Sequence, residues 1–228
     1  MRVAALYDVH GNLPALDAVL AELEDDGVDA IVIGGDVAAG PFPSETVERL
    51  RALGARVRWL RGNADRELAP GEEGSAPPEL IDWIRTRLSE EQISFLQGLP
   101  AQQTLDIDGL GRVLFVHATP RNDTEIFTAT TPDDRVAPVL EDVDADLVVC
   151  GHTHVQFDRV VERVRIVNAG SVGMAYEDEP GAYWLLLGPV VEHRRTAFEP
   201  APHDFPGEWP SATRAEATEF FERSAVGA

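Results

Sequence analysis

Short apolar runs that each stop at an acidic, amide or imidazole side chain are the feature that most constrains the fold of this chain. Apolar runs of about four to eight residues are typical of buried strands. The side chains that follow these runs belong to Asp8 and His10, Asp36, Asn63, His117, and His152 and His154. Because the carboxyl ends of parallel strands gather at one edge of an open α/β sheet, we expect these side chains to meet there. Of the six histidines, only His193 and His203 lie outside this pattern.

The order of the predicted elements favours an α/β fold. Strands are predicted at 2–8, 29–36, 56–63, 103–108, 111–118, 145–152, 164–170, 182–188 and 190–195. Helices are predicted at 13–23, 44–53, 78–97 and 211–225, with Asn12 capping the first and Ser89 breaking the third. Strand and helix alternate early and strands dominate later, which indicates two packed sheets with helices on their outer faces. We place one domain at 1–198, followed by a Pro-rich segment and a C-terminal helix at 199–228 that packs on it.

Composition excludes several kinds of partner and location. No stretch of about 18 consecutive apolar residues is present, so we expect no membrane-spanning helix, and the first residues do not resemble a signal peptide. The single cysteine, Cys150, permits no intrachain disulfide, which fits a reducing compartment and a cytoplasmic location. The formal net charge of −21 predicts repulsion of nucleic-acid polymers and anionic membranes. An anionic substrate would therefore need a local positive centre.

The seven donor side chains predict a site for two metal ions. They offer carboxylate and amide oxygens and imidazole nitrogens without thiolate, a set that suits manganese, iron, zinc or nickel. Seven donors exceed what one ion can use while it leaves room for a substrate. They fit two divalent ions that share a bridging carboxylate, an arrangement that clamps the attacking and leaving oxygens of phosphoryl displacement. Taken singly, Asp8, Asp36 and Asn63 would be ordinary cap or turn residues, so the prediction depends on the whole set.

The order of these blocks resembles that of a known family. The series Asp8-x-His10, Gly35-Asp36, Gly62-Asn63, His117 and Gly151-His152-x-His154 is similar to that of the calcineurin-like metallophosphoesterases. The resemblance extends from residue 3 to about residue 174 and is strongest to the small bacterial and archaeal phosphodiesterases of the YfcE type. It implies a four-layer αββα sandwich of two mixed β-sheets flanked by helices, in agreement with the predicted elements.

The resemblance also implies a role for each donor. One ion would be held by Asp8, His10 and His154, the other by Asn63, His117 and His152, and Asp36 would bridge the two. A hydroxide between the ions would attack phosphorus, so that Asp36, His117 and His152 would act in catalysis through the metals. The implied function is a di-metal-dependent phosphoesterase that hydrolyses small phosphoesters. We expect Gly151 to allow the sharp departure of the chain from the strand that precedes it.

One block departs from the family pattern. Most of the wider family has histidine after the Gly-Asn pair, where it is taken to protonate the leaving group or to stabilise the transition state, whereas this chain reads Gly62-Asn63-Ala64-Asp65. Ala64 cannot donate a proton. We therefore expect phosphodiesters with good leaving groups, rather than phosphomonoesters, to be the better substrates.

Several alternatives stay open at this stage. The chain could instead be a catalytically weak metal-binding scaffold of the same fold, although a scaffold has no need for a complete donor set. Arg121 would either contact the substrate phosphate or lie solvated in its loop, and we expect Asn168 to shape a turn. Phe220 and Phe221 are expected to pack the last helix on the body, with a homo-oligomer contact as the alternative. The walls of the pocket are predicted at residues 66–100 and 119–138.

Overall fold

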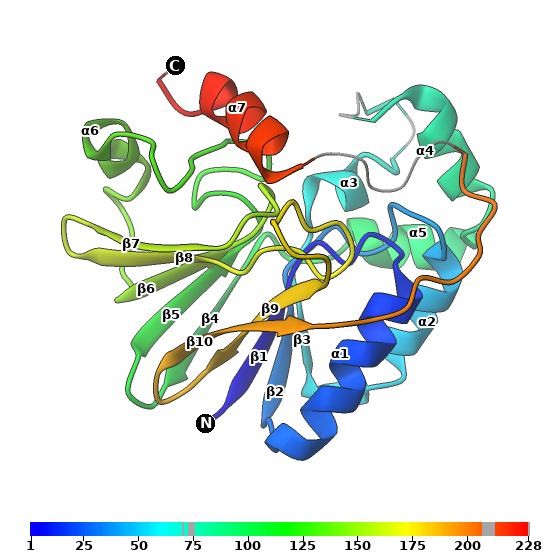
Figure 1. Cartoon of the computed structure of the whole chain (residues 1–228), viewed down its shortest axis with the longest axis horizontal. Coiled ribbons are helices and arrows are strands. Elements are labelled where there is room, and N and C mark those ends of the chain that lie inside the picture. The colour runs from blue at the N-terminus through cyan, green and yellow to red at the C-terminus, as the bar shows by residue number, and fades with distance from the viewer. Residues whose placement is uncertain (70, 73–75, 207–212, 228) are drawn as a thin grey trace.

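The computed structural model describes residues 1–69, 71–72, 76–206 and 213–227. Among these residues, two five-stranded sheets pack against each other (Figure 1). In the first sheet the strands are, in spatial order, β10 (Val191–Thr196), β9 (Ala182–Leu187), β1 (Val3–Leu6), β2 (Ala30–Ile33) and β3 (Val57–Trp59). In the second they are β4 (Gln102–Ile107), β5 (Gly111–Val116), β6 (Leu147–Cys150), β8 (Val164–Asn168) and β7 (Phe157–Val161). Both sheets are mixed, because each contains two parallel and two antiparallel strand pairings.

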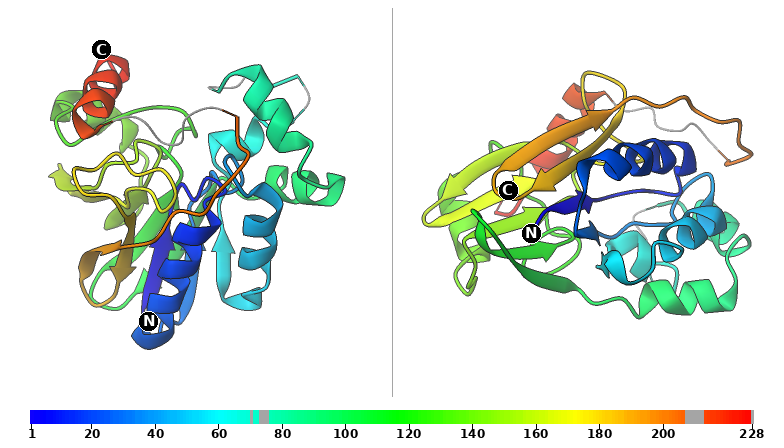
Figure 2. Two further views of the ribbon diagram at one scale, coloured as in Figure 1. Left: turned by 45° about the vertical axis from the view of Figure 1, so that its right-hand side comes forward. Right: turned by 90° about the horizontal axis from the view of Figure 1, so that it is seen from below.

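Helices flank the sheets on their outer faces. The helices are α1 (Leu13–Asp26), α2 (Pro43–Arg51), α3 (Asn63–Arg66), α4 (Pro78–Arg85), α5 (Glu90–Gln97), α6 (Asp133–Val136) and α7 (Arg214–Ser224), with 3-10 turns η1 (Gly54–Arg56) and η2 (Ala137–Val139). Figures 1 and 2 show α1 and α2 on the outer side of the first sheet. Short α6 and η2, with their loops, cover the second sheet. None of the helices in the described part of the chain is long and apolar enough to cross a membrane.

Alternation along the strands buries both faces of each sheet. In β1, Val3 and Ala5 belong to the core between the two sheets, whereas Ala4 and Leu6 belong to the core under α1 and α2. A strand that is covered on both faces has a continuous apolar sequence, and for this reason these strands could be predicted from the sequence. The resulting order of helices, sheet, sheet and short helices confirms the predicted four-layer αββα sandwich.

The predicted helix boundaries agree with the structure where a capping side chain marks them. Asn12 Oδ1 accepts a hydrogen bond from Ala15 N at 3.3 Å at the start of α1. The long helical segment is broken at Ser89, as predicted: Ser89 Oγ accepts from Gln92 N at 3.1 Å, and Gln92 Oε1 accepts from Ser89 N at 2.9 Å. This reciprocal pair is a capping box, and it starts α5 as a separate helix. The predicted residues 211 and 212 of the C-terminal helix lie outside the described residues.

The topology brings the carboxyl ends of the parallel strands to one end of the molecule. β1 pairs with β2 and β2 with β3 in parallel, and β5 pairs with β6 in the same sense. The loops that leave these strands at the top of Figure 1 carry the predicted metal ligands.

Candidate metal centre

The structure brings all seven predicted ligand side chains into one cluster. Each of them comes from a loop or a helix start that directly follows a strand. Asp8, His10, Asp36, Asn63, His117 and His154 are buried residues, each at most 7% exposed, and His152 is half-buried. Six buried polar side chains at one end of two sheets are costly unless something satisfies them. The cluster therefore has the chemistry of a ligand set rather than of a packed core.

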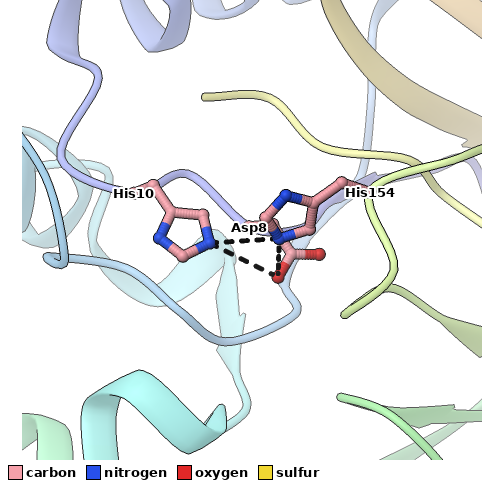
Figure 3. Close-up of side chains that lie close together, drawn as sticks. All are labelled: Asp8, His10 and His154. Atoms are coloured by element: carbon pink, nitrogen blue, oxygen red, sulfur yellow. Dashed lines mark hydrogen bonds and ion pairs between the residues drawn. The ribbon is translucent and has the colours of Figure 1, made fainter. Parts of the chain in front are cut away.

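The first group of ligands consists of Asp8, His10 and His154 (Figure 3). Asp8 Oδ1 lies 3.4 Å from His154 Nε2 and 3.9 Å from His10 Nε2, and the two Nε2 atoms are 3.2 Å apart. Asp8 Oδ1 is fully buried yet has no hydrogen-bond partner among the described residues. Leaving a carboxylate oxygen unsatisfied is unfavourable, whereas a cation among these three atoms would satisfy it. These residues therefore fit a divalent metal ion.

Backbone carbonyl groups fix the orientation of three imidazole rings. The Nδ1 atoms of His10, His117 and His154 lie 3.1, 2.9 and 2.8 Å from the carbonyl oxygens of Ala39, Gly34 and Met174, respectively. Since a carbonyl only accepts, each Nδ1 donates its proton, and in the neutral ring Nε2 carries the lone pair. This arrangement aims three Nε2 lone pairs into the cluster, as metal-binding histidines require.

The second group surrounds His117. Its Nε2 atom lies 3.5 Å from Asp36 Oδ2 and 3.0 Å from Asn63 Oδ1, and its ring centre is 5.2 Å from that of His152. Asp36 Oδ2 is also 3.7 Å from His10 Nε2, so Asp36 lies between the two groups. Asp8 Oδ1 is 3.9 Å from His117 Nε2, which places a second carboxylate within reach of both groups.

Burial and close charges shift the protonation of the cluster. Burial, with His154 nearby, lowers the pKa of His10 to about 3, and burial, with His117 nearby, lowers the pKa of His152 to about 3. Both rings are thus neutral at pH 7, the form that binds metal. Burial lowers the pKa of His117, but the Asp36 and Asp8 carboxylates outweigh it and raise this pKa to about 8. Burial raises the pKa of Asp36 well above its usual value.

Five of the seven ligands hold a left-handed backbone. The φ angles of Asp8, His10, Asp36, His152 and His154 are 53°, 48°, 52°, 66° and 57°. This region is unfavourable for residues with a Cβ atom and is found mainly where the surrounding structure enforces it. The sharp turns after β1, β2 and β6 therefore lie at the ligands themselves.

This geometry corrects the role expected for Gly151. Its φ is not positive, so it does not supply the left-handed turn after β6; His152 does. A Cβ atom at Gly151 would lie 2.4 Å from Asp8 Oδ2 and 2.6 Å from the Tyr7 ring. Glycine is required here because the backbone of β6 passes directly against the first carboxylate.

Backbone amides anchor one oxygen of each central carboxylate. His152 N donates to Asp8 Oδ2 at 2.9 Å, and Ala64 N donates to Asp36 Oδ1 at 2.8 Å. The other oxygen of each carboxylate faces the cluster. Asp65 adds a second layer, because its carboxylate accepts hydrogen bonds from the backbone amides of Asp36, Val37 and Gly62 at 2.9, 3.0 and 3.0 Å. It thereby joins the loops after β2 and β3.

Arg121 and Asn168 have structural partners. The Arg121 guanidinium forms an ion pair with Glu125, with Nε 3.0 Å from Oε2, and is 47% exposed. It lines a hollow of about 270 Å³ that also includes His117. Asn168 Nδ2 donates to Gly151 O at 2.7 Å, and its Oδ1 accepts from Gly170 N at 2.8 Å, so it shapes the turn as expected.

A cavity of about 440 Å³ opens onto the cluster. As predicted, part of its wall comes from 66–100 and 119–138, including Leu80, Ile84 and Ile126. Sequence reasoning missed a second part of the wall, formed by Met174, Tyr176, Phe205, Phe220 and Phe221. The only signal for these residues was their apolar or aromatic character near a polar C-terminal helix, which does not by itself indicate a pocket.

Comparison with known sequences decides the family. A profile of the calcineurin-like phosphoesterase superfamily domain matches residues 1–187. The chain belongs to this superfamily. Membership of the calcineurin-like phosphoesterases confirms the resemblance seen in the ordered sequence blocks and supports a hydrolase that uses divalent metal ions. The match ends with β9 and leaves β10 and α7 outside it.

This calcineurin-like phosphoesterase is similar to several individual proteins and solved structures. An uncharacterised protein of Methanocaldococcus jannaschii is 30% identical over 199 residues, which are 84% of this chain and 77% of the relative. A solved metallophosphoesterase from Sphaerobacter thermophilus is 28% identical, with a TM-score of 0.67 over 87% of this chain and 89% of the other. A hypothetical protein of Pyrococcus horikoshii has a TM-score of 0.75 at 22% identity, over 87% and 88%. The phosphoesterase Yfce of E. coli shares the fold, with a TM-score of 0.52 at 24% identity over 82% and 88%.

Proposed function

We propose that this chain is a di-metal-dependent phosphoesterase that hydrolyses small phosphodiesters. One observation carries the proposal: a buried cluster of seven oxygen and nitrogen donors, with an unsatisfied carboxylate oxygen at Asp8, lies at the floor of a cavity. A complete donor set favours an enzyme over a scaffold of the same fold, because a scaffold gains nothing from the strained backbone that holds the ligands.

The distances support a division of the ligands between two ions. Asp8, His10 and His154 would hold one ion, while Asn63, His117 and His152 would hold the second. Asp36 would serve both, since its Oδ2 atom lies 3.7 Å from His10 Nε2 and 3.5 Å from His117 Nε2.

Two divalent ions of manganese, iron, zinc or nickel would polarise a phosphoryl oxygen and activate water for attack on phosphorus. The residues set the charge around them. Asp8 and Asp36 supply two negative charges against four positive ones, and Asn63 adds none. The centre stays positive inside a chain of net charge −21, so a small phosphate ester can be attracted where a nucleic-acid polymer is repelled.

Because the Ala64 side chain cannot donate a proton, we expect the preferred substrate to be a phosphodiester with a good leaving group. Ala64 lines the cavity and is followed by Asp65, whose carboxylate is occupied by backbone amides. Neither side chain supplies a proton to a departing alkoxide. Leaving groups that are stable as anions need no such proton, so aryl phosphodiesters are expected to react fastest.

Metal reconstitution and hydrolysis of bis-p-nitrophenyl phosphate test the proposal. Protein stripped with EDTA and reloaded with manganese should contain close to two ions per chain by elemental analysis and should release nitrophenolate. His154→Ala should lower kcat/KM by at least about 10²-fold because an ion loses a ligand. His193→Ala, an exposed histidine on β10, is the matched control and should retain the wild-type rate. Metal-loaded wild type that leaves a panel of phosphodiesters and phosphomonoesters unhydrolysed would indicate a scaffold.

A further inference from the structure

The C-terminal helix contributes a wall of the cavity beside the metal centre. Phe220 and Phe221 of α7 line this cavity together with His152 and His154. Figures 1 and 2 place α7 and α4 at the same end of the sheets, on opposite sides of the loops that follow the strands. The helix lies outside the region matched by the family profile, so its role follows from this chain's own structure.

A series of aromatic rings leads from a metal ligand to the surface. The Tyr176 ring stacks on His154, with ring centres 5.0 Å apart and planes inclined by 26°. The centre of the Phe221 ring is 6.3 Å from that of Tyr176, and Phe220 is 5.3 Å from Phe221. Phe220 is 55% exposed, so the series ends at solvent. These spacings are those of interacting aromatic pairs.

Specific contacts hold α7 against the loops that border the site. The Arg214 guanidinium lies 2.6 Å from Glu177 Oε2, and Thr130 Oγ1 donates to Glu222 Oε1 at 2.5 Å. Just beyond the helix, Val226 N donates to Ile126 O at 2.8 Å. Because both ends of α7 are attached, the aromatic wall has a defined place relative to the ligands.

The opposite wall is apolar and carries no positive charge. Leu80, Ile81 and Ile84 of α4 face the cavity. Apart from the ligand Asp36, the only charged side chain among the described lining residues is Glu67, and none of them is a lysine or an arginine. A second phosphate group would find no cation here. The part of the substrate beyond the reacting phosphate is therefore expected to be uncharged.

We propose that Phe221 and Tyr176 select phosphoesters that carry an aromatic ring, which they hold beside the metal centre. The proposal rests on the proposed function, since the phosphate must be bound by the ions for the ring to reach this wall. A flat ring fits between the aromatic series and the aliphatic α4 side chains, and stacking adds to the gain from burial. The volume of about 440 Å³ is in the usual range of small-molecule sites.

Calorimetric titration of the manganese-loaded protein with two phosphonates tests the selection. Phenylphosphonate and methylphosphonate share the metal-binding group, resist hydrolysis, and differ only in the ring. Wild type should bind phenylphosphonate about tenfold more tightly, as expected for burial of most of a ring. Phe221→Ala should remove most of this preference and leave the affinity for methylphosphonate unchanged.

Matched variants distinguish the contribution of the Phe221 ring to binding from an effect of the substitution on folding. Phe221→Leu keeps an apolar side chain that supports α7 but loses the stacking face, so it should keep less of the preference than Phe221→Tyr, which retains the ring. Glu219→Ala, an exposed position on the same helix, should behave as wild type. A second pair of ligands, adenosine 5′-phosphate and ribose 5-phosphate, distinguishes the two sources of the ring: a preference in this pair indicates a nucleobase, and a preference confined to the phosphonates indicates a simple aryl group.

The outcomes separate this inference from the proposed function. Equal affinity for the two phosphonates, or a preference that survives in both Phe221→Ala and Phe221→Leu, would overturn the selection by Phe221 even if the enzyme is active. Phosphonate binding with the expected preference, but without hydrolysis of any ester, would overturn the proposed function and leave the aromatic selection standing. Failure of both phosphonates to bind the metal-loaded protein would overturn the aromatic selection, whereas hydrolysis of the ester panel decides the proposed function separately.

Discussion

Asp36 is the ligand whose position between the two groups has the clearest consequence. Its Oδ2 atom faces both His10 and His117, so its charge is shared. We expect Asp36→Asn to weaken the binding of both metal ions and to lower kcat/KM. The reason is that the negative charge that reduces the repulsion between the two dications is lost. His154→Ala should weaken mainly one site. Elemental analysis after dialysis at graded manganese concentrations measures both effects.

The outcome for Asp36 distinguishes a bridge from a terminal ligand. Loss of a single ion from Asp36→Asn would make it a terminal ligand, and full retention of metal and rate would remove it from the centre. In that case Asp8, whose Oδ1 atom also lies within 3.9 Å of both groups, would be the shared carboxylate.

Ala64 offers a test of leaving-group preference. Its backbone is held by the hydrogen bond from Ala64 N to Asp36 Oδ1, and the residue lines the cavity, so a histidine here would face the bound ester. A positioned general acid contributes roughly 10²–10⁴-fold when the leaving group needs a proton. Ala64→His should raise kcat/KM for alkyl esters relative to nitrophenyl esters.

The measured quantity for Ala64→His is the ratio of kcat/KM for the two ester types, in wild type and variant. Metal content and thermal unfolding serve as controls, since the larger side chain must be accommodated in a buried position. An unchanged ratio in a folded, fully metallated variant would mean that position 64 does not set the preference.

At the scale of elements, capping side chains decide where helices begin. The Ser89 capping box starts α5 after the break that follows α4. Ser89→Ala should lower the free energy of unfolding by about 1 kcal/mol, because the amide of Gln92 loses its acceptor. Urea unfolding followed by circular dichroism measures this change.

Ser94→Ala is the control for the cap, since Ser94 is exposed within the same helix. It should be neutral or slightly stabilising, as alanine is the better helix former. Equal effects of the two substitutions would mean that the cap contributes nothing beyond helix propensity.

The elements that could be predicted are those with a continuous or periodic apolar pattern. β1, β2, β6 and β9 are buried on both faces, and α1 repeats its apolar residues at helical spacing. β7 was missed because its central residues are exposed or half-buried and include Asp158 and Arg159. The four-residue helices α3 and α6 were missed because a single turn carries no periodicity.

For the whole molecule, metal binding should contribute to stability as well as to catalysis. Buried Asp8 and Asp36 have histidines but no arginine as ion-pair partners among the described residues, so metal ions that bind only the folded state stabilise it. Removing the metals with EDTA should lower the midpoint of thermal unfolding by on the order of 5–10 °C, given about 2–4 °C per kcal/mol for a chain of this size.

Scanning calorimetry before and after chelation, with the chelator dialysed away, measures the effect. Re-addition of manganese should restore the higher midpoint. Asp36→Asn is the useful comparison, because a weakened centre should show a smaller shift. An identical midpoint with and without metal would mean that the folded protein binds the metal ions no more tightly than the unfolded chain does.

The meeting of the candidate ligand side chains could be predicted from the sequence, and the pocket only in part. Each ligand follows an apolar strand, and parallel strands must end together, so local patterns determined a distant meeting point. No comparable sequence pattern predicts the position of Phe221. It reaches the site because α7 packs beside the loops that border the cavity, and that placement depends on tertiary contacts such as Arg214 with Glu177. Which strands share a sheet is equally non-local, as β9 returns to pair with β1.

The left-handed backbone of the candidate ligands has a consequence for the evolution of this chain. A descendant of this chain that no longer needed metal would keep the strain at positions 10, 152 and 154 without its benefit. Glycine there would relax about 1–2 kcal/mol per residue while erasing a ligand. In a chain that no longer binds metal, each such step would relieve strain and raise stability, so selection for stability would favour it. Loss of the metal centre would then act as a ratchet, because recovering a ligand would mean giving up the stability gained.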